Sequence, residues 1–98
     1  METSQASPLE KELEIVNELG LHARCAAMIA MAAEKARGDV RISKNGHEVD
    51  GGSTLDILSL DCPRGTRIKI RITDPNDQPV LEDICGLVAR GFGEIREP

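Results

Sequence analysis

The segment from residue 18 to residue 27 holds the side chains of this sequence that are best suited to chemistry. His22 lies where a glycine-containing loop meets an alanine-rich run, and Arg24 follows two residues later. Helix N-termini present unpaired backbone N–H groups and a partial positive charge, so they bind anions. An imidazole there can take a phosphoryl group whose oxygens are held by the first-turn amides and Arg24. Phosphoryl transfer depends mainly on positioning and charge neutralisation, so we expect no cofactor. The same spacing also fits a second interpretation, in which His22 only caps the helix.

The three cysteines of the sequence do not predict a metal site or a disulfide framework. Cys25, Cys62 and Cys85 are an odd number and form no CxxC pair, whereas structural zinc sites bring their ligands in close pairs. His22 and Cys25 could share one helical face, but any further ligand would have to be His47, Cys62 or Cys85. We therefore interpret Cys62 and Cys85 as packing residues, expect no metal ion, and expect a reducing cytoplasmic location.

Composition excludes several classes of function. The chain has 98 residues, enough for one small domain, with 40% hydrophobic and 30% charged residues. Its 12 basic and 17 acidic residues give a net charge of −5, and Phe92 is its only aromatic residue. We therefore expect no nucleic-acid partner, because both a basic surface and a stacking platform are lacking. The longest apolar stretch, residues 25–33, is far shorter than the about 20 residues of a membrane span, so no membrane insertion is expected.

Hydrophobic periodicity predicts four strands and three helices after a polar leader at residues 1–8, so that residues 9–98 form a single domain. Alternating apolar and polar side chains predict strands at residues 11–17, 39–44, 47–50 and 67–73, the middle two joined by an Asn-Gly turn. Helices are predicted at residues 23–37, ending at a Gly38 with positive φ, from the Ser53-x-x-Asp56 capping box, and from Pro79 to about Arg90.

Each predicted strand has one apolar and one charged face, which favours helices on one side of the sheet only. The expected fold is α+β, an open-faced two-layer sandwich of order β-α-β-β-α-β-α with a four-stranded antiparallel sheet. If the first and last strands pair, acidic and basic side chains should face each other on the bare side of the sheet, namely Glu12 and Glu14 against Arg67, Lys69 and Arg71.

The residues from Glu18 to Ala27, ELGLHARCAA, resemble the active-site motif of the HPr family, the histidine-containing phosphocarriers of the bacterial sugar phosphotransferase system. Three further blocks are similar to that family and stand in the same order, at residues 49–60, 63–68 and 91–94. The resemblance covers about residues 11–94, and several blocks in register are far more specific than a lone His-Ala-Arg.

The resemblance implies a role for each matching residue. His22 would accept a phosphoryl group on its δ nitrogen from phosphorylated enzyme I, itself charged by phosphoenolpyruvate, and pass it to an enzyme IIA domain. Arg24 would bind the phosphate, and Ser53 aligns with the serine that a dedicated HPr kinase modifies in some bacteria. A monomer is expected, because both partners use one small docking face, which here would comprise Ala23, Ala27, Met31, Thr54, Leu55 and Leu58.

Two features depart from the family pattern. Cys25 stands where the family usually has proline. The simpler interpretation of Cys25 is an ordinary small buried side chain, and the alternative is a thiol whose place in the first turn of a helix lowers its pKa and makes it oxidisable. Glu34 and Asp56 stand where enteric relatives present lysines around the docking face, which favours other partners, such as those of the nitrogen-related NPr branch. Ser53 also has a purely structural interpretation, as the first residue of the capping box.

Two other classes of function remain open at the level of the sequence. The chain could be a regulatory binding module controlled by phosphorylation at Ser53 or His22, without any sugar-transport traffic. It could also be a small-molecule-sensing α/β domain, although no polar cluster is evident apart from His22 and Arg24.

Overall fold

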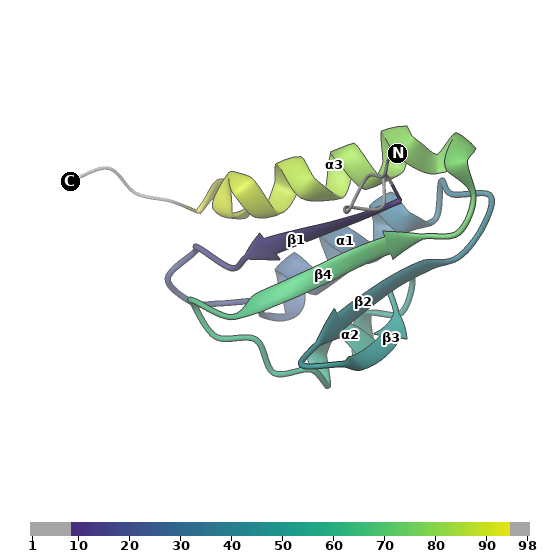
Figure 1. Cartoon of the computed structure of the whole chain (residues 1–98). Helices are drawn as coiled ribbons and strands as arrows, with labels where there is room; N and C mark the ends of the chain where they lie inside the picture. Colours follow the sequence, from purple (N-terminus) through teal and green to yellow (C-terminus); the bar gives the residue numbers. More distant parts are fainter. Residues whose placement is uncertain (1–8, 95–98) are drawn as a thin grey trace, which may run out of the picture.

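A four-stranded antiparallel sheet covered on one side by three α-helices makes up the fold (Figure 1). The computed structural model describes residues 9–94, so the predicted leader at residues 1–8 lies outside the described residues. The strands β1 (Glu10–Glu14), β2 (Val40–Lys44), β3 (His47–Asp50) and β4 (Arg67–Ile72) lie in the order β1-β4-β2-β3. The helices are α1 (Ala23–Ala33), α2 (Thr54–Leu58) and α3 (Gln78–Ala89), with short 3₁₀ turns at η1 (Pro75–Asp77) and η2 (Gly91–Gly93). The predicted α+β sandwich and its order of elements are confirmed.

Strand β4 shows how the pattern of one segment organises both layers. Its isoleucines Ile68, Ile70 and Ile72 are buried under the helices, whereas Arg67 and Lys69 are exposed on the open face. The predicted pairing of β1 with β4 is confirmed, with Glu12 opposite Lys69 and Glu14 opposite Arg67. Because these charge pairs are exposed, they contribute little to stability and mainly specify the register.

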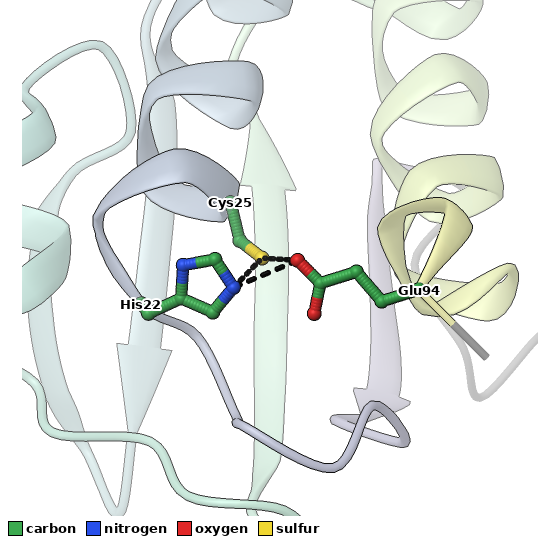
Figure 2. A group of neighbouring side chains, drawn as sticks. All are labelled: His22, Cys25 and Glu94. Carbon is green, nitrogen blue, oxygen red and sulfur yellow. Dashed lines mark hydrogen bonds and ion pairs between the residues drawn. The ribbon is translucent and has the colours of Figure 1, made fainter. Parts of the chain in front are cut away.

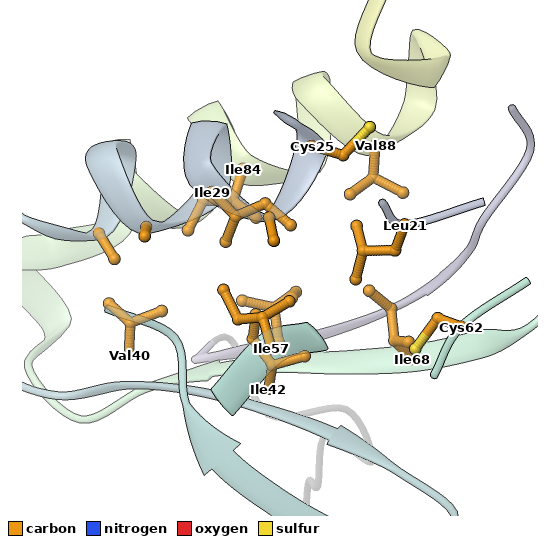
Figure 3. Packing of buried hydrophobic residues seen from close by; sticks show 14 of the residues in the cluster. Leu21, Cys25, Ile29, Val40, Ile42, Ile57, Cys62, Ile68, Ile84 and Val88 are labelled. Carbon is orange, nitrogen blue, oxygen red and sulfur yellow. The ribbon is translucent and has the colours of Figure 1, made fainter. Parts of the chain in front are cut away.

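The hydrophobic core lies between the sheet and the helices (Figure 3). Cys62 and Phe92 are buried in it, and Cys85 packs against its edge, which confirms the interpretation of Cys62 and Cys85 as packing residues. The last helix, α3, faces the core with one stripe of side chains, of which Leu87 is partly buried and the others are buried: Val80, Leu81, Ile84 and Val88.

Helix α1 ends earlier than its alanine content predicts. The expected end was Arg37 before a Gly38 with positive φ, but α1 ends at Ala33 and Gly38 does not have a positive φ. The buried carboxylate of Asp77 accepts hydrogen bonds from the backbone N–H groups of Arg37, at 2.8 and 3.0 Å, and Gly38, at 2.8 Å. Gly38 is needed for space, since a Cβ there would lie 2.5 Å from the hydroxyl oxygen of Thr73. A tertiary contact thus overrides the helix propensity of the segment.

Other predicted element ends also differ from the structure. Strand β1 stops at Glu14 rather than at residue 17, because Ile15 turns its backbone to the loop after Cys62: its N–H bonds Thr66 O at 2.8 Å, and its carbonyl accepts from Gly65 N at 2.7 Å. Strands β2 and β4 each lose one residue at an end, α3 begins at Gln78 rather than Pro79 and ends at Ala89 rather than Arg90, and the turn η1 precedes it.

Only one of the two hydrogen bonds of the capping box predicted for α2 is present. The Ser53 side chain accepts a hydrogen bond from the N–H of Asp56 at 3.2 Å, as an N-cap does. In a full capping box the N–H of Ser53 would donate to the side chain of Asp56. Here it donates instead to the carbonyl of Asp50 at 3.1 Å, in the turn after β3.

No helix within residues 9–94 is long and apolar enough to cross a membrane.

Asp77 offers a test of what ends α1. In an Asp77→Ala variant two partly buried backbone N–H groups lose their acceptor, so we expect the free energy of unfolding to fall by about 2–4 kcal/mol in urea titrations. Asp77→Asn keeps one acceptor oxygen, so its free energy of unfolding should lie between those of wild type and Asp77→Ala. Asp83→Ala, an exposed aspartate on α3, is the matched control. Equal stability of Asp77→Ala and Asp83→Ala would contradict this account.

Candidate functional site

A tight loop between β1 and α1 sets the position of His22. Gly20 has a φ of +74°, and a Cβ on it would lie 2.7 Å from the carbonyl oxygen of Cys62, so only glycine fits. The N–H of Gly20 bonds Asn17 O at 3.0 Å, and the N–H of Leu21 bonds Cys62 O at 2.8 Å. The loop is thereby fixed to the core on both sides before the chain enters α1.

His22 is the N-cap residue of α1, but its side chain forms no capping hydrogen bond. The imidazole instead points away from the helix axis toward the segment after α3 (Figure 2), where its Nε2 lies 2.7 Å from Oε2 of Glu94. The side chain of His22 therefore does not cap the helix, although His22 is its N-cap residue. The first turn of α1 carries no acidic residue, so its free N–H groups keep their positive potential for an external anion.

The carboxylate of Glu94 is the centre of the site. Besides His22, it is contacted by the guanidinium of Arg24 through Oε2 and by the side-chain amide of Asn17 through Oε1 at 3.0 Å. Asn17 is buried and also donates to Gly20 O at 2.7 Å, so it links the loop to the segment after α3. These contacts join residues from opposite ends of the chain.

The charge of Glu94 determines which nitrogen of His22 can react. Hydrogen bonds from Arg24, then from Asn17 and His22, lower the pKa of Glu94 from 4.5 to about 2. An ionised carboxylate only accepts hydrogen bonds, so Nε2 of His22 carries the proton that faces it. In the neutral ring the lone pair then lies on Nδ1, which Figure 2 shows on the side of the ring away from Glu94. In this tautomer Nδ1 is the ring nitrogen that can act as a nucleophile.

Arg24 is held beside the imidazole by the turn η2. Its Nη2 donates to the carbonyl of Phe92 at 3.0 Å as well as to Glu94. The hydrogen bond to Glu94 and the charge of that carboxylate raise the pKa of Arg24 further above its ordinary value. Phe92 has a φ of +57°, a left-handed conformation that aims its carbonyl at the guanidinium while its ring is buried. About half of the Arg24 side chain remains exposed, so it can also reach a bound anion.

Cys25 is fully buried directly behind His22. Its Sγ lies 3.4 Å from Nε2 of His22 and 3.7 Å from Oε2 of Glu94 (Figure 2). Burial, and then the negative charge of Glu94, raise the pKa of the Cys25 thiol. The structure therefore supports the interpretation of Cys25 as a small buried side chain. The alternative of a lowered pKa was wrong, because it considered the helix N-terminus and neglected desolvation. Within residues 9–94, His22, Cys25 and Glu94 bring three potential metal-ligand atoms within 4.8 Å of one another.

The residues predicted to form the docking face lie on α1 and α2, which pack against each other. Leu55 and Met31 are 78% and 67% exposed, values unusual for large apolar side chains and typical of a contact surface. Ala23 is also exposed, whereas the remaining three are half-buried: Ala27, Thr54 and Leu58. Leu19, 75% exposed in the loop before His22, is a further exposed apolar side chain that the sequence did not single out.

Asn17 and Glu94 are the site residues that sequence reasoning missed. Asn17 was expected at the end of a strand, and Glu94 belonged to a block that resembled the family but received no role. The contacts that Glu94 makes with Asn17, His22 and Arg24 span 70 to 77 residues of sequence, so no local pattern predicts them. The one sequence signal for Glu94 was its place in the block at residues 91–94, which is similar to the HPr family.

Comparison with known proteins agrees with the fold and the site. A family model described as the PTS HPr component phosphorylation site matches residues 9–90. The phosphocarrier protein HPr of Cupriavidus necator is 31% identical over 86 residues, which cover 88% of this chain and 97% of that protein. The phosphocarrier protein NPr of Escherichia coli K12 is 29% identical over 87 residues, with 88% and 97% covered. The crystal structure of HPr-C-His from Thermoanaerobacter tengcongensis has a TM-score of 0.83 at 29% identity, covering 89% of this chain and 98% of that one.

These similarities extend over the strands, the helices and the segment that carries His22. They include both HPr and NPr proteins at nearly equal identity. The chain therefore belongs to the HPr family, the phosphocarrier proteins of the phosphotransferase system.

Proposed function

We propose that this protein accepts a phosphoryl group on Nδ1 of His22 from phosphorylated enzyme I and passes it to an enzyme IIA domain. The observation that carries the proposal is the contact between Nε2 of His22 and the ionised Glu94, which leaves the lone pair on Nδ1. Family membership supplies the context of the phosphotransferase system, and sugar transport is the pathway most often served by it.

Each transfer exchanges one phosphorus bond for another. The Nδ1 lone pair of His22 forms a bond to phosphorus as the bond between phosphorus and the donor breaks, and the same exchange in reverse loads the acceptor. The protein only has to position the ring and neutralise the phosphoryl oxygens. Arg24 and the free N–H groups at the start of α1 supply that neutralisation.

The apolar surface formed by Ala23, Ala27, Met31, Thr54, Leu55 and Leu58, here called the docking face, is proposed to contact both partners in turn. It lies on the helix that begins at His22 and on the helix packed against it, so a bound partner reaches the imidazole. The protein is proposed to be a monomer, because both partners must reach the same small face in turn. Its proposed location is the cytoplasm.

Acidic side chains next to this face are proposed to select the partners. Glu34 and Asp56 are both exposed, and the net charge of the chain is −5. Opposite charges across an interface raise the rate of association, and like charges suppress wrong pairs. The cognate surfaces are therefore proposed to be basic, as would suit a separate, nitrogen-related branch.

Ser53 is proposed as a regulatory phosphorylation site that a dedicated kinase would use. A phosphate on its Oγ would still accept the N–H of Asp56 and would place negative charge beside Leu55. The cap contact by itself already accounts for a serine here. A purely regulatory protein, controlled at Ser53 or His22, is thus the alternative that the following experiment separates from the carrier.

The two histidines allow a matched test of the phosphorylation site. On incubation with phosphoenolpyruvate, magnesium and enzyme I of the same organism, intact mass at neutral pH should show one added phosphoryl group that acid removes. His22→Ala should gain none, whereas His47→Ala, which changes the exposed histidine of β3, should gain one. Absence of any gain in the folded wild-type protein would reject the carrier and favour the regulatory alternative.

The docking face can be tested at its two most exposed apolar residues. Met31→Ala and Leu55→Ala should each raise the KM for this protein in the enzyme I reaction about fivefold, a loss of about 1 kcal/mol of binding. Their stability should change by less than about 0.5 kcal/mol, because exposed side chains contribute little to the core. Lys69→Ala, on the opposite face of the sheet, serves as the control, and an equal rise in its KM would argue against this location.

The role of Glu94 predicts a pH-dependent stability. A carboxyl group whose pKa is lowered on folding stabilises the protein above its ordinary pKa, and this contribution is lost as the pH falls from about 5 to about 2. Glu94→Gln should therefore be less stable than wild type at pH 7 and equally stable near pH 2. In an Arg24→Ala background the difference at pH 7 should shrink, since Arg24 is the main cause of the shift. A difference that does not change with pH would refute this account.

A further inference from the structure

We propose that His22, Cys25 and Glu94 form a binding site for one zinc ion, and that the bound ion stops His22 from accepting a phosphoryl group. The existence of the site is independent of the proposed function, whereas the inhibitory effect rests on it. The third ligand of this site is the thiol of Cys25. A proline at position 25, which is usual in the family, would offer no ligand atom.

The distances between the three ligand atoms are close to those of a tetrahedral zinc site. Zinc bonds of about 2.0–2.3 Å at tetrahedral angles separate sulfur from nitrogen and from oxygen by about 3.6 Å, and nitrogen from oxygen by about 3.4 Å. The observed separations are 3.4 Å for Sγ to Nε2 and 3.7 Å for Sγ to Oε2. Only the contact between Nε2 and Oε2, at 2.7 Å, must widen, because a hydrogen bond now occupies that place.

The donor set also fits zinc in kind. A thiolate, an imidazole and a carboxylate are each ordinary zinc ligands, and three protein ligands with a fourth open position are typical of reactive zinc sites. Cys25 closes the inner side, while the His22 and Glu94 side chains are 33% and 21% exposed, so the fourth position faces solvent. Asn17 holds the other carboxylate oxygen of Glu94 at 3.0 Å, the kind of outer contact that orients a metal ligand.

Metal binding changes the reactive nitrogen of His22 through its proton. In the metal-free site Nε2 carries the proton and Nδ1 has the lone pair. Zinc can bind Nε2 only when Nε2 has lost its proton, because the bond to the metal uses the lone pair of that nitrogen. The single proton of the neutral ring then lies on Nδ1, which it reaches by way of solvent. The thiol proton of Cys25 is released to water, and Oε2 of Glu94 exchanges its contacts with His22 and Arg24 for the ion. With Nδ1 protonated, no lone pair remains to attack phosphorus.

A cobalt titration tests the site without any phosphotransfer. Co²⁺ added to the reduced, metal-free full chain should give the visible bands of a tetrahedral ion and a thiolate charge-transfer band, at one ion per chain, and Zn²⁺ should remove both. Cys85→Ser, which changes a cysteine outside the site, should behave as wild type. Cys25→Ser should lose the charge-transfer band, and its affinity should fall by more than the roughly 10- to 100-fold that follows loss of an outer partner.

A second variant, at the carboxylate ligand, controls for the loss of metal binding through misfolding. Glu94→Gln keeps the thiol and should retain the charge-transfer band at a weaker affinity, with circular dichroism confirming that both variants are folded. No charge-transfer band in wild type, or an equal band in Cys25→Ser, would overturn the site.

The inhibitory effect is measured in the phosphoryl-acceptance assay. One equivalent of Zn²⁺ should slow phosphoryl uptake by wild type about tenfold or more, and a chelator should restore it. Uptake by Cys25→Ser, whatever its rate, should not respond to zinc, which also controls for zinc acting on enzyme I. Unchanged uptake by zinc-loaded wild type would overturn the inhibition. If wild type accepts no phosphate even without zinc, the proposed function fails, and the cobalt titration still decides the site.

Discussion

The ionised carboxylate of Glu94 is the interaction on which the site depends. It receives hydrogen bonds from Asn17, His22 and Arg24, and so ties the turn after α3 to the loop before α1. Glu94 and the sulfur of Cys25 both contact Nε2 of His22, and Glu94 makes the shorter contact, at 2.7 Å against 3.4 Å. A single acid therefore sets the ring orientation, the tautomer and the place of the guanidinium. The sheet and helices serve to bring these distant segments together.

The same arrangement would allow an exchange of anions during the proposed phosphoryl transfer. Arg24 binds a carboxylate in the resting structure, and a guanidinium binds carboxylate and phosphate oxygens with similar geometry. Since about half of the Arg24 side chain is exposed, it can turn to a phosphoryl group on Nδ1 while keeping its bond to Phe92. The contact between Glu94 and Nε2 needs no change, because it lies on the other side of the ring. The site can thus receive charge at one edge of the imidazole while the other edge stays fixed.

Local pattern predicted the fold well and the site only in part. The alternation of Arg67 to Ile72 placed β4 within one residue, because burial on one face of a sheet repeats every second residue. The end of α1 was missed, since alanine content cannot reveal a carboxylate 40 residues away that binds Arg37. Glu94 was missed for the same reason, and the direction of the Cys25 pKa shift was wrong because burial outweighs the helix end. Sequence carries the repeating features, whereas single long-range polar contacts depend on the assembled fold.

Cys25 stands where the resemblance to the family implies a proline, and the side chain at this position decides the chemistry next to His22. Cys25 is the third residue of α1, and the N–H of that position has no partner within the helix, so proline and cysteine both fit the turn. The choice between them is therefore decided by the side chain. A proline ring offers only carbon atoms there, whereas Cys25 places sulfur 3.4 Å from the nitrogen that fixes the tautomer of His22. Any ligand that engages this sulfur must also act on the imidazole, so recognition at Cys25 and reactivity at His22 are physically coupled.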